Sequence, residues 1–149
     1  MKRKISLFLM ILLLLACCAC GQEGTKASAD GLDVDLTAMS STMVYAEVNN
    51  MMTSPQDYIG KNVKMEGQFV RYPAMDTNGN EIPDKAYFAC VIADATSCCV
   101  QGMEFITREE YTYPADYPAE GEDIVVTGTF QTYEENGYLY CTLVDAVLG

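Results

Sequence analysis

The residues with the greatest chemical capacity in this chain are its cysteines. Of 149 residues, seven are cysteine and none is histidine. The cysteines are Cys17, Cys18, Cys20, Cys90, Cys98, Cys99 and Cys141. Thiolate sulfur is both a nucleophile and a ligand for soft metals. Without histidine a Ser-His or Cys-His catalytic pair cannot form, and the sequence has no phosphate-binding glycine loop. We therefore expect a protein that is not an enzyme.

The four cysteines beyond residue 43 allow several interpretations. Each can be a small buried hydrophobe or half of a disulfide bond. Cys98 and Cys99 are adjacent, and a bond between them would strain the backbone. A thiolate site for zinc or copper(I) would use Cys90, Cys98, Cys99 and Cys141, with zinc as the candidate cofactor. A thiol-redox protein is the remaining alternative.

The first three cysteines follow an export signal. Basic residues at positions 2–4 precede an apolar run over 5–15. This run is too short to cross a membrane, which takes about 20 residues. The run ends in Leu14-Leu15-Ala16-Cys17, which resembles the lipobox of bacterial lipoproteins. The resemblance implies that residues 1–16 are a lipoprotein signal peptide and that Cys17 carries the lipid, with Cys20 as the alternative anchor. Two acyl chains suffice for stable membrane attachment.

The charge of the processed chain restricts its partners. Without the signal, six basic residues stand against 21 acidic ones, a net charge of −15. Nucleic acid is therefore excluded as a partner, because its phosphates require clustered lysine and arginine. We expect the protein at the cell membrane, lipid-anchored on the extracytoplasmic face. Residues 17–42 should form a lipidated flexible tether, since 21–35 are rich in small and polar residues.

The pattern after residue 40 predicts a short helix followed by strands. Ser40 or Ser41 could cap a helix from Thr42, with Val44 and Val48 on one face. Apolar residues then alternate over 60–72 and again over 121–133, in matching segments. The segments 87–95 and 138–146 also match, with Asn136-Gly137 as a hairpin turn, and 98–106 is a fifth strand. Gly67 and Gly128 fall on the buried face, where glycine permits strong coiling.

These elements predict an all-β domain with a short N-terminal helix. We expect residues 43–149 to form a five-stranded OB-fold-like barrel with sheet order 1-2-3-5-4. The domain cysteines then fall on three neighbouring strands. Cys90 and Cys141 should point into the barrel, and one of Cys98 and Cys99 could join them.

Tyrosines on the predicted outer faces offer a second kind of site. Tyr45, Tyr87, Tyr138 and Tyr140 are expected to be exposed. They could stack on a ligand, or they could form cross-strand pairs with no ligand at all.

One motif resembles a known group of proteins. Residues 98–105, Cys-Cys-Val-Gln-Gly-Met-Glu-Phe, resemble a motif in small uncharacterised OB-fold-like lipoproteins of clostridia-like Gram-positive bacteria. The Cys98-Cys99 pair alone is also similar to a Cys-Cys-Ala-Ala-Asp stretch in a bacterial two-protein permease family. The resemblance implies a non-enzymatic binding or accessory module outside the cell, with a membrane transporter or a small ligand as partner.

Overall fold

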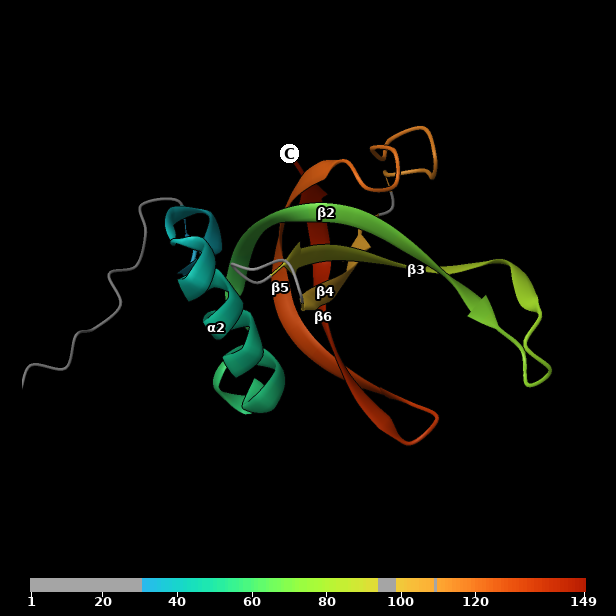
Figure 1. Ribbon diagram of the computed structural model, residues 1–149, viewed down its shortest axis with the longest axis horizontal. Helices are drawn as coiled ribbons and strands as arrows, with labels where there is room; N and C mark the ends of the chain where they lie inside the picture. The colour runs from blue at the N-terminus through green and yellow to red at the C-terminus, as the bar shows by residue number, and fades with distance from the viewer. Residues whose placement is uncertain (1–30, 94–98, 109) are drawn as a thin grey trace, which may run out of the picture.

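The structure is a computed structural model that describes residues 31–93, 99–108 and 110–149. The described chain is mostly β-sheet with one α-helix, which confirms the predicted class (Figure 1). The strands are β1 (Val34–Asp35), β2 (Asn62–Met75), β3 (Glu81–Ala93), β4 (Val100–Thr107), β5 (Asp123–Glu135) and β6 (Tyr138–Leu148). The helix α2 spans Ser41–Thr53, between the short 3-10 helices η2 (Leu36–Ala38) and η3 (Pro55–Asp57).

The strands form one sheet in the order β1-β2-β3-β4-β6-β5, and β2 also pairs with β5. The five long strands thus follow the predicted order 1-2-3-5-4. All pairs among them are antiparallel except β4 with β6, which is parallel. The sheet has six strands rather than five, because the two-residue strand β1 adds to β2 in parallel.

Local residue choices explain the hairpin between β5 and β6. Glu135 pairs with Tyr138, so the turn contains only Asn136 and Gly137, with φ of +53° and +81°. A two-residue turn with both φ values positive matches the twist of the flanking strands, and Asn-Gly is its favoured sequence. The predicted turn is confirmed.

Glycine is required where the strands coil most strongly. A Cβ atom on Gly67 would lie 2.5 Å from the carbonyl oxygen of Val91 and 3.0 Å from the sulfur of Cys90. On Gly128 it would lie 2.9 Å from the carbonyl oxygen of Val144. Both glycines therefore face the interior, as their places in the two matching segments predict.

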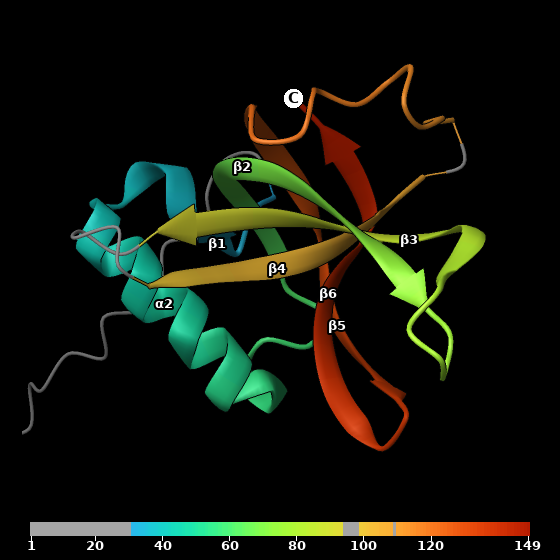
Figure 2. The ribbon, with the colours of Figure 1, turned by 45° about the vertical axis from the view of Figure 1, so that its right-hand side comes forward.

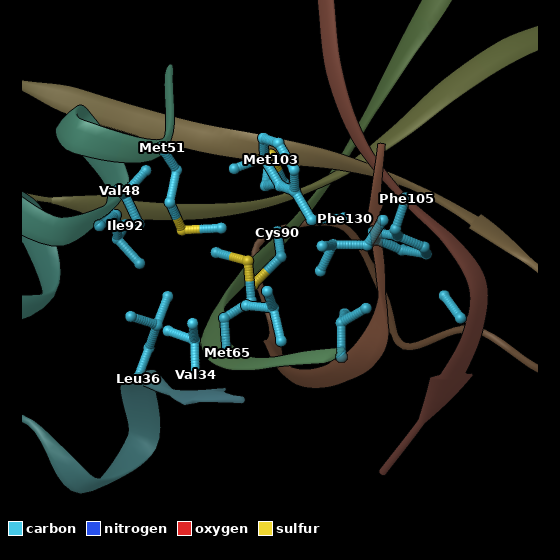
Figure 3. Close-up of a cluster of buried hydrophobic side chains, with 14 of the residues drawn as sticks. Val34, Leu36, Val48, Met51, Met65, Cys90, Ile92, Met103, Phe105 and Phe130 are labelled. Atoms are coloured by element: carbon cyan, nitrogen blue, oxygen red, sulfur yellow. The ribbon is translucent and has the colours of Figure 1, made fainter. Parts of the chain in front are cut away.

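The core lies between the strands and α2. Figure 3 shows the side chains of Cys90, Met65 and Met103 close together, with Met51 and Val48 of α2 beside them. These five residues are almost completely shielded from solvent. The prediction that Val44 and Val48 lie on one packing face of the helix is confirmed, because Val48 is buried in the core and Val44 packs against it.

The folded part begins earlier than the sequence analysis expects. Val34 and Leu36 belong to the predicted tether 17–42, but they are 8% and 1% exposed and lie in the core (Figure 3). Asp35 ends β1 and accepts a hydrogen bond from the backbone N–H of Thr37, which caps η2. The boundary at residue 43 is therefore wrong. The tether interpretation missed this short packed segment because only two of its residues are buried hydrophobes.

The helix α2 and the turns of the two long hairpins lie at different ends of the strands. In Figures 1 and 2, α2 packs at one end of the strands, and the β2–β3 and β5–β6 turns project away from it. Among the described residues, no helix is long and apolar enough to cross a membrane.

Candidate functional site

Cys90 lies in the core and is unsuited to thiolate chemistry. It is fully buried on β3, and its Sγ lies 3.9 Å from the carbonyl oxygen of Ile124. Burial raises the pKa of this thiol to about 12, with the charge of Glu66 adding to the effect. The thiol therefore stays protonated and acts as a small hydrophobe. Its predicted inward orientation is confirmed.

Cys141 is only half-buried, although the sequence analysis places it inside the barrel. It lies on β6 beneath α2, with its Sγ 4.0 Å from the carbonyl oxygen of Met51. Desolvation raises the pKa of its thiol, and the carboxylate of Glu104 raises it further. Cys141 thus packs against the edge of the core.

The described cysteines do not come together as a metal site. Cys99 is exposed and precedes β4, whereas Cys90 pairs with Met103 further along that strand. Cys99 and Met103 are four residues apart along the chain, which in a strand is a distance of about 13 Å, so Cys99 lies far from Cys90. Cys98 lies outside the described residues. Within the ranges that the structure describes, no three Cys, Asp or Glu residues are placed to hold a metal ion. The expected thiolate cluster is therefore not formed by Cys90, Cys99 and Cys141.

A polar group at the centre of the outer sheet face is the stronger candidate. Met103 and Phe105 of β4 point into the core, so Glu104 between them points outward. It pairs with Ala89 on β3 and with Thr142 on β6. Glu104 is therefore held in the middle of the sheet and not at a flexible edge.

Glu104 is partly buried beneath a tyrosine from a more distant strand. The hydroxyl of Tyr133 on β5 donates a hydrogen bond to the Glu104 carboxylate. Desolvation raises the pKa of Glu104, and nearby Glu135 acts in the same direction, although the Tyr133 hydrogen bond opposes them. Burial and the same carboxylate raise the pKa of Tyr133. The pair is thus a neutral phenol bonded to a poorly solvated carboxylate.

A second tyrosine–carboxylate pair joins the two sides of this face. The hydroxyl of Tyr87 on β3 donates to Glu135 on β5 at 2.6 Å, and Lys85 forms an ion pair with the same carboxylate at 3.2 Å. These hydrogen bonds lower the pKa of Glu135, Tyr87 contributing most. The end of the β5–β6 hairpin is thereby tied across the outer face to β3.

Glu104 borders three adjoining hollows. The first, of about 170 Å³, also contacts Met52, Leu139 and Cys141. The second, of about 240 Å³, lies over Tyr72 and Val91.

The third hollow is the most aromatic. It has a volume of about 340 Å³ and is lined by Ala86, Tyr87, Phe88, Glu104, Phe105, Ile106, Thr107, Tyr117 and Tyr133. A concave surface with several rings and one poorly solvated carboxylate is typical of a small-ligand site.

The predicted tyrosines contribute unequally to this face. Tyr87 lines the third hollow and Tyr140 the first, whereas Tyr138 is 68% exposed at the hairpin. Tyr140 stacks on Tyr133 of the neighbouring strand with ring centroids 5.3 Å apart, which is the expected cross-strand arrangement. Tyr45 on α2 and Tyr87 on β3 are both only half-exposed, so the predicted exposure is wrong for these two tyrosines.

Sequence reasoning missed Tyr133 and Tyr117, and it included Glu104 only as part of the motif 98–105. The signal for Glu104 was a carboxylate between two core residues, Met103 and Phe105, in an alternating strand. Such a residue has to lie on the opposite sheet face.

A larger hollow of about 680 Å³ lies between η2, the start of α2 and the ends of β3 and β4. Its lining includes Glu66 and Asp123 and runs to Ala93 on one side and Val100 on the other.

Comparison with known proteins adds no assignment. No protein-family model matches the chain, and no curated protein matches it significantly.

Proposed function

We propose that the protein is a membrane-anchored extracytoplasmic lipoprotein that acts as a non-enzymatic binding or accessory module. The anchor would be Cys17, or alternatively Cys20, and residues up to about 32 would form the tether. The partner would be a small ligand or a membrane transporter. The same proposal includes a relationship to the small lipoproteins of clostridia-like bacteria, whose motif residues 98–105 resemble.

We further propose that the sheet is an OB-fold-like barrel. The support is the strand order, because β2, β3, β4, β6 and β5 pair in sequence and β2 also pairs with β5. The parallel pairing of β4 with β6 fits a five-stranded Greek-key barrel.

The observation that carries the binding function is the set of hollows around Glu104. A carboxylate with little solvent, held by Tyr133 and bordered by aromatic side chains, suits recognition more than support of the fold. Burial of a charged group costs free energy, and an apolar side chain could support the fold at this position without that cost. The cysteines offer less, since Cys90 is shielded and the described thiols do not converge.

Lipidation is tested by labelling the full-length chain in a Gram-positive host with an alkyne analogue of palmitate. Wild type and Cys20→Ala should carry the label in the membrane fraction, and Cys17→Ala should lose it. Loss in Cys20→Ala alone would move the anchor to Cys20. Absence of label from every variant would refute the lipoprotein proposal.

A further inference from the structure

The aromatic hollow at Glu104 exists because β3 and β4 separate. The two strands pair from Ala93 with Val100 to Phe88 with Phe105. Beyond that point β3 stays with β2, where Ala86 pairs with Pro73, and β4 continues along β6. The gap between them is the third hollow of about 340 Å³, which we call the fork pocket.

The rings around the fork pocket come from elements far apart in the chain. Phe88 and Phe105 contribute from the last paired residues of β3 and β4, and Tyr117 contributes from the loop after β4. Tyr117 packs on Phe88 with ring centroids 4.7 Å apart and stacks on Phe105 at 6.4 Å. Tyr87 and Tyr133 complete the aromatic lining.

The tyrosine hydroxyls of this lining already have partners. Tyr117 shares a 2.7 Å hydrogen bond with Thr107, and Tyr87 donates to Glu135 at 2.6 Å. Tyr133 donates to the carboxylate of the pocket itself. The rings are thereby fixed in place, and what they offer a ligand is mainly their faces. A sugar, which needs many hydrogen-bond partners, is a poor match for such a lining.

In the part of the chain that the structure describes, no basic side chain pairs with the carboxylate of the pocket. Among the described residues, the ion pair is that of Lys85 with Glu135, and no lysine or arginine nitrogen lies within 4.0 Å of Glu104. Partial burial without a cation is unfavourable for the ionised form, in agreement with the raised pKa of Glu104. A bound cation would relieve this cost.

The protein places its own cations over tyrosine rings, both outside the fork pocket and, at Tyr87, on its lining. Lys61 lies 4.7 Å from the ring centroid of Tyr58, and Arg71 lies 5.6 Å from that of Tyr113. Lys85 lies 5.4 Å from the ring of Tyr87. Positive charge is attracted to the negative face of an aromatic ring, and most strongly where water is excluded.

We propose that the fork pocket binds a small organic ammonium ion, with its positive charge near the Glu104 carboxylate and its alkyl groups against the rings. The inference rests on the proposed binding function and names its ligand class. The volume is near the lower end for small-molecule sites, which favours a compact ion. A bare metal ion fits less well, because Glu104 is the one charged side chain among the described residues of the lining.

The test uses choline as the probe and 3,3-dimethyl-1-butanol as its uncharged analogue of nearly the same shape. Each is titrated by calorimetry into the full-length chain in a nonionic polyoxyethylene detergent. Choline should bind, and the dissociation constant of the uncharged analogue should be at least about tenfold higher. Equal binding of the two, or no choline binding, would overturn the proposal.

Two substitutions locate the site. Glu104→Gln keeps the shape and a hydrogen-bond acceptor for Tyr133, and it should weaken choline binding at least about tenfold. Glu134→Gln removes the same charge from an exposed position on β5 outside the pocket lining, and it should change binding by less than about twofold.

Tyr117→Leu should also weaken binding by removing one ring of the lining, while the thermal unfolding curve of each variant reports whether it is folded. Equal effects of Glu104→Gln and Glu134→Gln would mean that net charge alone attracts choline, which refutes the site. None of these variants affects palmitate labelling at Cys17, so failure of the ligand assignment remains distinct from failure of the lipoprotein proposal.

Discussion

At the scale of single residues, two groups with raised pKa values have different surroundings. Cys90 is enclosed by hydrophobic side chains, and its protonated thiol only packs against them. Glu104 is partly enclosed, but it borders three hollows and holds a hydrogen bond from Tyr133. Desolvation acts on both groups, yet only Glu104 lies where a ligand can reach it.

We predict that Cys90 in the folded protein resists alkylation by iodoacetamide at neutral pH. Its thiolate is scarce because burial raises the pKa to about 12, and its sulfur is shielded from the reagent. Peptide mapping by mass spectrometry should find Cys90 unmodified in the native protein and modified after denaturation. Rapid native modification would contradict the packing of the core.

We also predict that Glu104→Gln stabilises the protein near neutral pH. The folded state raises the pKa of Glu104, so it binds the proton more tightly than the unfolded chain. The ionised side chain is therefore unfavourable for folding at high pH, and this cost disappears as pH falls through the raised pKa.

Urea unfolding of wild type and Glu104→Gln at about pH 7 and about pH 4 measures the effect. The variant should have the larger free energy of unfolding at the higher pH. The difference between the two proteins should narrow at the lower pH, because Glu104 of the wild type becomes protonated. A gap that widens on acidification would show that the charged form stabilises the fold.

At the scale of elements, the coiling of β2 and β5 depends on two glycines that lack a side chain on the inner face. A methyl group at Gly67 would meet the Val91 backbone, which cannot move without shifting β3. The same holds for Gly128 against the Val144 backbone. The two positions correspond in the repeated segments, and close strand packing requires glycine at both.

Gly67→Ala is therefore expected to lower the free energy of unfolding by about 1–3 kcal/mol, the usual range for an overpacked core. Glu66→Ala, at the exposed neighbouring position, should change it by less than about 0.5 kcal/mol. Chemical denaturation of both variants provides the comparison. Similar values for the two would show that the strands have room for a side chain at residue 67.

At the scale of the whole molecule, the segment before α2 closes one side of the core. β1 adds to β2, and Leu36 of η2 is 1% exposed beside Val48 and Met51. The folded unit therefore includes residues that the composition alone assigns to a tether.

We predict that Leu36→Ala lowers the free energy of unfolding by about 2–5 kcal/mol, as for other buried leucines. Met43→Ala, at a residue that is 58% exposed on α2, should have an effect below about 0.5 kcal/mol. Urea unfolding distinguishes the two variants. A negligible effect of Leu36→Ala would restore the boundary at residue 43.

The sequence by itself determined the elements. Alternating apolar residues identified the strands over 60–72 and 121–133, and a second pair of matching segments identified those over 87–95 and 138–146. Asn136-Gly137 identified a hairpin turn, and Gly67 and Gly128 were assigned to the inner face. These features depend on backbone geometry and on neighbours within a few residues, so they can be recognised locally.

Only the tertiary structure decided which side chains meet. Tyr133 and Glu104 are 29 residues apart, and Tyr87 and Glu135 are 48 apart, yet each pair forms a hydrogen bond. The separation of β3 from β4, which opens the fork pocket, likewise follows from pairings with two other strands. The burial of a side chain, its pKa and the shape of a site depend on such contacts between residues that are distant in the sequence. No single strand forms a surface of the sheet alone.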